Sequence, residues 1–320
     1  MATHAAIVRP TIKTKSRLGG DELAKAFTFL FAALIIALTL LVVWQLWLGS
    51  TPTREKFGFT FLTSQLWNPV TDEFGALPFI YGTVLTSLLA LLISVPLGVG
   101  AAIYLSELAL PKLSNSLTFL VELLAAVPSV IFGLLAIFTL VPLMRDYVQP
   151  GLKQAFGFSP LFTGPAFGVG YLTAGIILAV MTFPFIISVS REALMAVPRE
   201  QREAALALGA TKWESTWQIV VPFARLGIMG SVFLGLARAL GETMAVTMVI
   251  GNDPKIHASL ISPGYTIAAV VANEFTEASG QMHASALVEL GLVLFALTMV
   301  INGLAQVMIV LTTGKGSAKA

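Results

Sequence analysis

One basic side chain, Arg238, lies in the middle of a long apolar run, where a charge requires a chemical explanation. It is the twelfth of 23 residues in the run 227–249, and Glu242 follows four residues later within the string RALGE. On an unbroken helix these two side chains share one face. A charge at the centre of a bilayer costs roughly 2.5–3.5 kcal/mol, so Arg238 needs an anionic partner.

Two explanations for this pair are open. In the first, Arg238 and Glu242 neutralise each other and fix the packing of the run. In the second, Arg238 lines a path for an anionic substrate, and Glu242 either holds Arg238 or accepts a hydrogen bond from a protonated oxyanion. Protonated phosphate can donate that bond and sulfate cannot, so a buried carboxylate would discriminate between them. Thr243 is a further donor beside the pair, although threonines in spans often bond their own backbone.

The segment 191–225 gathers charge between two apolar runs. Alanine and leucine predict a short helix over 199–208, with Pro198 at its start and Gly209 ending it in a left-handed conformation. A second helical start is predicted at 211–217. A smooth, alanine-rich helix flanked by charge suits a groove in another protein. A plain solvated helix between two spans is the alternative.

The composition places these residues in a membrane protein. The chain of 320 residues is 56% hydrophobic and 11% charged, with a mean hydropathy of +0.86. Apolar runs of about 18 or more residues, such as 26–48, predict membrane-spanning helices. We therefore expect an all-α polytopic fold with a basic tail at 1–25, a six-span membrane domain at 26–312 and a short tail at 313–320. The expected spans are 26–48, 79–105, 117–143, 169–190 (interrupted at Pro184), 227–249 and 285–311.

The distribution of Lys and Arg predicts the orientation. Segments 1–25, 106–116, 191–225 and 313–320 together hold 13 of these residues, and the opposite loops 49–78, 144–168 and 251–284 hold 5. Basic residues favour the cytoplasmic side. Both termini and the charged segment are therefore expected in the cytoplasm.

The charged segment also carries a spaced motif. It reads Glu203-Ala204-Ala205, three residues, Gly209, nine residues, Ile219, one residue, Val221 and Pro222. This string resembles the EAA loop of ABC importer permeases, except that Val221 stands where that family more often has Leu. The resemblance implies a coupling helix that docks in a separate ATPase through Glu203, Ala204, Ala205, Gly209 and Pro222.

Two further strings extend the resemblance over most of 75–312. Residues 238–246, followed by Gly251-Asn252, and residues 121–133 are similar to the permease subunits of phosphate importers. This implies a type I ABC importer permease fold in a prokaryotic plasma (inner) membrane. It implies as partners a homologous permease subunit, an ATP-binding cassette dimer and an extracytoplasmic phosphate-binding protein. It also places Arg238 and Glu242 on the phosphate path, without separating this subunit from its homologous partner.

Several chemistries are not expected. The chain has no cysteine, its histidines are scattered (His4, His257 and His283), and it lacks a phosphate-binding G-x4-GK[ST] loop. We expect no metal, cofactor or nucleic-acid partner, and ATP hydrolysis by another chain. The rival functions are a permease for sulfate or molybdate, a proton-coupled secondary transporter that uses Glu242, and a sensor of phosphate status that does not transport.

Overall fold

The computed structural model describes residues 20–278 and 280–313, and these fold almost entirely into helices. The only β-type pairings in this part are two isolated bridges, Asn68–Glu73 and Gly251–Gly264. The described residues divide into two compact units, with the boundary between Leu48 and Gly49. Each unit is described separately below.

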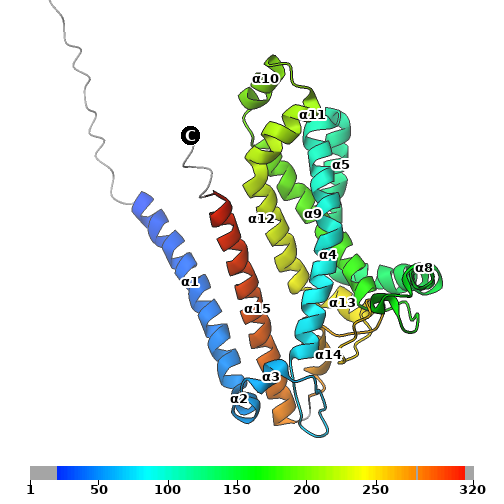
Figure 1. Ribbon diagram of the computed structural model, residues 1–320. Helices are drawn as coiled ribbons and strands as arrows, with labels where there is room; N and C mark the ends of the chain where they lie inside the picture. The colour runs from blue at the N-terminus through cyan, green and yellow to red at the C-terminus, as the bar shows by residue number, and fades with distance from the viewer. Residues whose placement is uncertain (1–19, 279, 314–320) are drawn as a thin grey trace, which may run out of the picture. The chain divides into compact units, whose positions relative to one another are not determined.

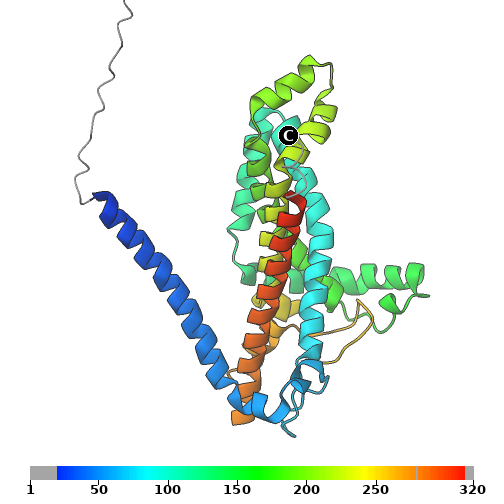
Figure 2. The same ribbon diagram turned by 60° about the vertical axis from the view of Figure 1, so that its left-hand side comes forward.

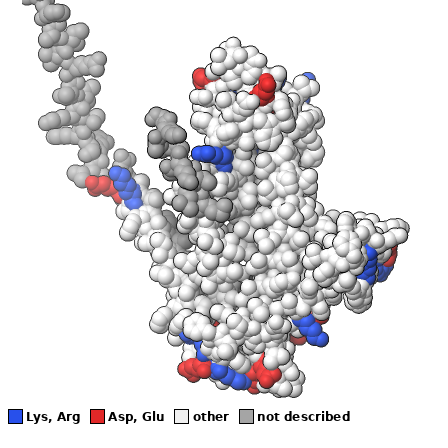
Figure 3. Space-filling view, in the orientation of Figure 1, with Lys and Arg blue, Asp and Glu red and all other residues white. Residues whose placement is uncertain are grey.

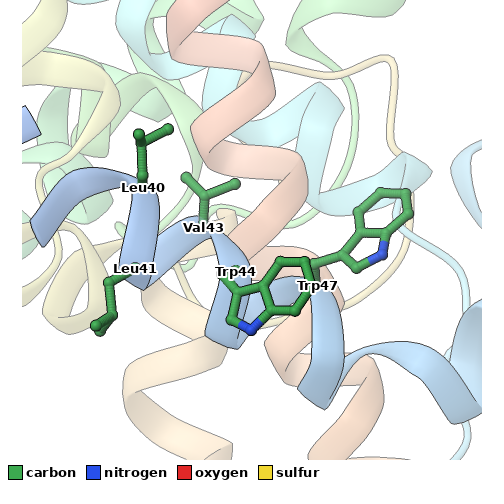
Figure 4. A pocket seen from close by; sticks show the side chains of 5 residues that line it. All are labelled: Leu40, Leu41, Val43, Trp44 and Trp47. Carbon is green, nitrogen blue, oxygen red and sulfur yellow. The ribbon is translucent and has the colours of Figure 1, made fainter. Parts of the chain in front are cut away.

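The first unit is the long helix α1 (Gly20–Gly49), whose apolar side chains point in all directions. A helix that is apolar all round is typical of a membrane span. Its side chains line two shallow pockets, and the one shown in Figure 4 is apolar and formed by Leu40, Leu41, Val43, Trp44 and Trp47. This pocket holds no charged group, so it is not a site for an anion.

The second unit is built on three helices that pack against one another: α4 (Leu77–Ile103), α9 (Tyr171–Met195) and α12 (Val221–Leu240). The helix α15 (Gln281–Thr313) contacts α12 and runs beside it in both ribbon views (Figures 1 and 2). Small residues allow these helices to approach closely. A Cβ added at Gly98 of α4 would lie 2.8 Å from the Ile186 side chain of α9.

Shorter elements connect these helices, and five of them (η1, η2, η3, η5 and the 3-10 turn η4) depart from α-helical geometry. They are α2 (Thr51–Phe57), α3 (Thr60–Thr63), η1 (Tyr104–Leu108), α5 (Pro111–Ala125), α6 (Ser129–Leu135), η2 (Ala136–Leu140), α7 (Val141–Leu143), η3 (Met144–Val148), α8 (Gln149–Phe156), η4 (Pro160–Phe162), α10 (Arg199–Ala207), α11 (Lys212–Ser215), η5 (Thr216–Val220), α13 (Met244–Val249) and α14 (Ile267–Glu274).

Six helical segments in the described part are long and apolar enough to cross a membrane. They are Glu22–Gly49, Leu77–Leu108, Ser129–Phe156, Tyr171–Met195, Lys212–Leu240 and Gln281–Val307. On the face of the second unit seen in Figure 3, charged side chains gather near α10, at the opposite end and on the α8 arm. Most of the surface between these places is uncharged, apart from one patch of Lys or Arg below the α10 end.

The third span differs from the expected 117–143. Helix α5 ends at Ala125, and α6 begins only at Ser129, after a break of three residues. Pro128 explains the break, because it has no N–H to donate and disfavours helical backbone in the residue before it. The apolar helix of spanning length therefore runs over Ser129–Phe156.

The fifth span differs from the expected 227–249. The helical run covers Lys212–Leu240, stops at Gly241 and resumes as α13 at Met244.

The fourth span has no interruption at Pro184, so that prediction is wrong: α9 continues through this buried proline. Packing on both sides of α9 thus holds the helix together where the local sequence would break it.

Candidate functional site

The residues in which the sequence places the chemistry lie at the break between α12 and α13 or in the helical turn before it. Arg238 lies in the last turn of α12, while Glu242 and Thr243 lie in the non-helical link to α13. Discontinuous helices inside a membrane protein free backbone groups and commonly form the substrate sites of transporters. The break therefore gives this region a geometry that an unbroken helix would lack.

Arg238 is half-buried, and its guanidinium rests on an aromatic ring. Its Cζ atom lies 4.4 Å from the centroid of the Phe185 ring on α9. Its Nε is buried and has no hydrogen-bond partner among the described residues. A cation over an aromatic face is attracted to the ring quadrupole, but this attraction leaves the N–H donors unused. The Phe185 ring thus positions Arg238, while its Nε–H remains able to donate a hydrogen bond to a ligand.

The structure corrects the predicted relation between Arg238 and Glu242. No ion pair joins them in the described part of the chain, because α12 ends at Leu240 and the two side chains no longer share a helix face. Instead, Glu242 Oε1 accepts a long hydrogen bond of 3.4 Å from the Ala245 backbone N–H at the start of α13. Mutual neutralisation therefore does not account for Arg238 in this conformation.

The threonines beside the break bond to their own backbone. Thr243 Oγ1 donates to the Gly241 carbonyl at 3.4 Å, and Thr247 Oγ1 donates to the Thr243 carbonyl at 2.8 Å. The Thr243 bond is long, so this hydroxyl can reorient at small cost. The Thr247 bond is short and typical of a threonine within a helix.

The helix that follows a second break packs against α13, close to the first break. The sequence did not predict this proximity. Helix α6, which follows the break at Pro128, contacts α13. Gly133 of α6 lies so close that an added Cβ would be 3.2 Å from the Ala245 Cα. In the sequence, Pro128 and Gly133 are the two residues that could have indicated a helix break and a close helix contact. Only the tertiary structure shows that this contact is with α13, the helix that follows Arg238 and Glu242.

The charged segment 191–225 folds largely as its sequence predicts. Helix α10 covers Arg199–Ala207, and Gly209 follows with φ of +89°, which confirms the left-handed end. Thr211 and Glu214 form a capping box that starts α11. Pro198 precedes α10 as its N-cap and is not its first residue.

The EAA-like residues divide between two faces. Glu203 and Ala204 are exposed, Ala205 is buried, and Pro222 lies in the first turn of α12. Sequence reasoning did not single out Arg202, the residue next to Glu203. It forms an ion pair of 2.8 Å with Glu107.

Among the described residues, no group of three His, Asp or Glu side chains could hold a metal ion.

Residues 94–310 match the protein family described as "Binding-protein-dependent transport system inner membrane component". The chain is 49% identical over 284 residues to the phosphate transport system permease protein PstC of Mesorhizobium japonicum, covering 87% of each chain. The PstC of Pasteurella multocida is 45% identical, with 90% of this chain and 91% of the relative covered. The chain belongs to the PstC family. A probable PstC of the archaeon Methanocaldococcus jannaschii is 34% identical and is covered over 94% of its length.

Solved structures agree with PstC membership at the level of fold. A bacterial alginate ABC transporter chain aligns with a TM-score of 0.58 at 16% identity, covering 90% of this chain and 96% of that one. A chain of the MetNI methionine ABC transporter aligns with a TM-score of 0.50 at 19% identity, covering 73% and 93%. The chain therefore has the all-α fold of ABC importer permeases, and this PstC-family member is a multi-pass membrane permease subunit.

Proposed function

We propose that this chain is the transmembrane permease subunit of an ATP-driven importer of inorganic phosphate. Membership of the PstC family supports the substrate and the class of transporter. Arg238 is the observation that carries the proposal. It is a half-buried cation whose Nε has no hydrogen-bond partner in the described part, at a break in a spanning helix. A phosphate oxyanion would supply both the charge and the acceptors that Arg238 lacks.

The partners follow from this function. A homologous permease subunit would complete the path, and an extracytoplasmic phosphate-binding protein would deliver the substrate. An ATP-binding cassette dimer would hydrolyse ATP in the cytoplasm and dock on the exposed face of α10 and on the turn after it, through Glu203, Ala204 and Gly209. Ala205 would support this face from behind, because it is buried. Exposed Glu203 and Ala204 support such docking. The chain would sit in the prokaryotic plasma (inner) membrane with both termini in the cytoplasm, as the excess of Lys and Arg in the segments on that side favours.

Transport would proceed by alternating access. ATP binding and hydrolysis in the cassette dimer would move α10, and the two permease subunits would expose a central path first to one side and then to the other. Arg238 would attract phosphate without binding it tightly, since the external binding protein would share the selection of substrate. Glu242, which does not pair with Arg238, would be available to accept a hydrogen bond from a protonated phosphate.

Uptake of labelled phosphate into proteoliposomes that contain the whole complex tests this function. We expect uptake that requires ATP on the cassette side and is not inhibited by sulfate. Uptake without ATP would point to a secondary carrier. Competition or uptake of sulfate would keep the architecture but overturn the assigned substrate.

A further inference from the structure

A charged contact joins the predicted docking helix to two spanning helices. Arg202 of α10 donates from Nε to Glu107 Oε2 at 3.1 Å and from Nη2 to Glu107 Oε1 at 2.8 Å. The same guanidinium donates to the carbonyls of Leu194 at 2.7 Å and Val197 at 2.5 Å. All three of its nitrogens are therefore engaged. The forked pairing with a carboxylate is the geometry that favours Arg over Lys.

The contact is shielded from solvent. The Arg202 and Glu107 side chains are 21% and 10% exposed, unlike the open pair Arg145–Asp146 at 54% and 49%. Leu194 and Val197 belong to a buried apolar cluster with Ala102, Ile103, Val220 and Ala224. A shielded, fully hydrogen-bonded pair is costly to break, because either partner alone would remain charged and poorly solvated.

The contact joins three elements: α10, the end of α4 and the end of α9. Glu107 lies in η1, which continues α4 at its end, and Leu194 lies in the last turn of α9. Arg202 and buried Ala205 form the inner face of α10, while Glu203 and Ala204 are exposed. A force on the exposed face of α10 therefore reaches α4 and α9 through the inner face.

Helix α9 also leads to the candidate substrate site. It runs without a break from Tyr171 to Met195, and Phe185 on this helix contacts Arg238. A displacement of the Leu194 end of α9 is thus carried along a rigid element to the ring that holds Arg238. Packed helices with defined alternative positions are the usual carriers of coupling between distant sites.

We propose that Arg202 and Glu107 form the joint that passes movement of α10 to α4 and α9, and hence to Arg238. This inference rests on the proposed function, because it assumes that an ATPase docks on α10. Arg202 and Glu107 are positioning residues and touch neither substrate nor nucleotide. Without the joint, α10 would move with the ATPase while the spanning helices lag behind.

The test compares Glu107→Gln, Arg202→Lys and the exchanged pair Arg202→Glu with Glu107→Arg in the reconstituted whole complex. The measurement is ATP hydrolysed per phosphate taken up. Two exposed residues of the same region serve as matched controls: Glu192→Gln removes a carboxylate from the last turn of α9, and Lys112→Gln removes a cation from α5.

We expect each single variant to raise the ATP consumed per phosphate by about fivefold or more, the lower end of ordinary coupling between sites. The exchanged pair should recover at most the part that the ion pair carries, because Glu at position 202 cannot donate to the Leu194 and Val197 carbonyls. The two controls should match the unaltered complex. A joint that only stabilised the fold would reduce the yield of complex without changing this ratio.

The proposal of the joint would be wrong if the wild-type complex transports phosphate normally and the ATP consumed per phosphate is unchanged in Glu107→Gln and Arg202→Lys. That result would leave the proposed function intact. Arg202→Lys keeps the charge and loses the fork, so it provides the same test if Glu107→Gln fails to assemble. Absence of ATP-dependent phosphate uptake in the wild-type complex would instead refute the proposed function. The two failures are therefore distinguishable.

Discussion

The guanidinium of Arg238 lies over the ring of Phe185, with 4.4 Å between Cζ and the ring centroid, and this contact links α12 to α9. It stands in place of the ion pair with Glu242, which was one of the two explanations that the sequence left open. A ring holds a cation in place without satisfying its N–H donors. The contact therefore positions Arg238 and leaves it able to receive an anion.

Replacement of the ring should weaken transport. The cation–π contact is worth roughly 0.5–2 kcal/mol, so we expect Phe185→Leu to lower phosphate uptake by about 2- to 30-fold. Phe185→Trp should retain most of the uptake, because it keeps an aromatic face. Phe183→Leu is the matched control, since Phe183 lies on the same helix and is not a cation–π partner of Arg238 in the described part. Equal losses in Phe183→Leu and Phe185→Leu would argue against a specific role for the contact.

Loss of the charge itself should have a larger effect. We expect Arg238→Gln to abolish ATP-dependent phosphate uptake while the complex still assembles, because the path would lose its cation. Arg238→Lys should retain part of the uptake, since it keeps the charge but not the planar fork. Uptake in proteoliposomes and the yield of purified complex measure the two effects. Normal uptake by Arg238→Gln would remove this residue from the path.

Glu242 should affect selectivity more than the position of Arg238. Among the described residues, its carboxylate has only the long bond to the Ala245 N–H, so it is available to a protonated oxyanion. An unsatisfied buried polar group costs about 1–3 kcal/mol. We expect Glu242→Gln to improve competition by sulfate by about 5- to 150-fold. Sulfate inhibition curves for labelled phosphate uptake measure this change, and unchanged curves would mean that Glu242 does not read the substrate's proton.

Gly209 should be required for its backbone conformation and not for its small size. Its φ is +89°, and no atom would lie within 4 Å of an added Cβ. A β-branched residue in the left-handed region is strained by roughly 1–2 kcal/mol, whereas Asn adopts this region readily. We expect Gly209→Val to reduce phosphate uptake per ATP and Gly209→Asn to resemble the wild type. Equal loss in both variants would instead indicate that the docked ATPase needs the space.

Two glycines of α4 should differ in their effect on stability. A Cβ at Gly98 would lie 2.8 Å from the Ile186 side chain, whereas at Gly100 it would meet nothing within 4 Å. Overpacking typically costs about 1–3 kcal/mol. We expect Gly98→Val to lower the thermal unfolding midpoint of the chain in detergent and Gly100→Val to leave it nearly unchanged. Similar midpoints for the two variants would contradict close packing of α4 on α9.

Local chemistry made α10 and its ending predictable from the sequence. Alanine and leucine favour a helix over 199–208, and a glycine at position 209 is suited to the left-handed residue that follows. Both preferences act within a few residues, so no distant contact was needed to infer them. The same holds for Thr211 and Glu214, whose spacing allows a reciprocal cap.

The sequence alone determined the class of fold and the number of apolar helices, because lipid forces every backbone polar group into hydrogen bonds within its own segment. It did not determine the ends of the third and fifth spans, since packing decides where a break can be tolerated. It left Glu242 open as a partner of Arg238, on the assumption that an unbroken helix holds both on one face. The helix ends at Leu240, and the partner is a ring on another helix. The pairing of Arg202 with Glu107, 95 residues apart, likewise exists only because α4, α9 and α10 meet at one end of the fold.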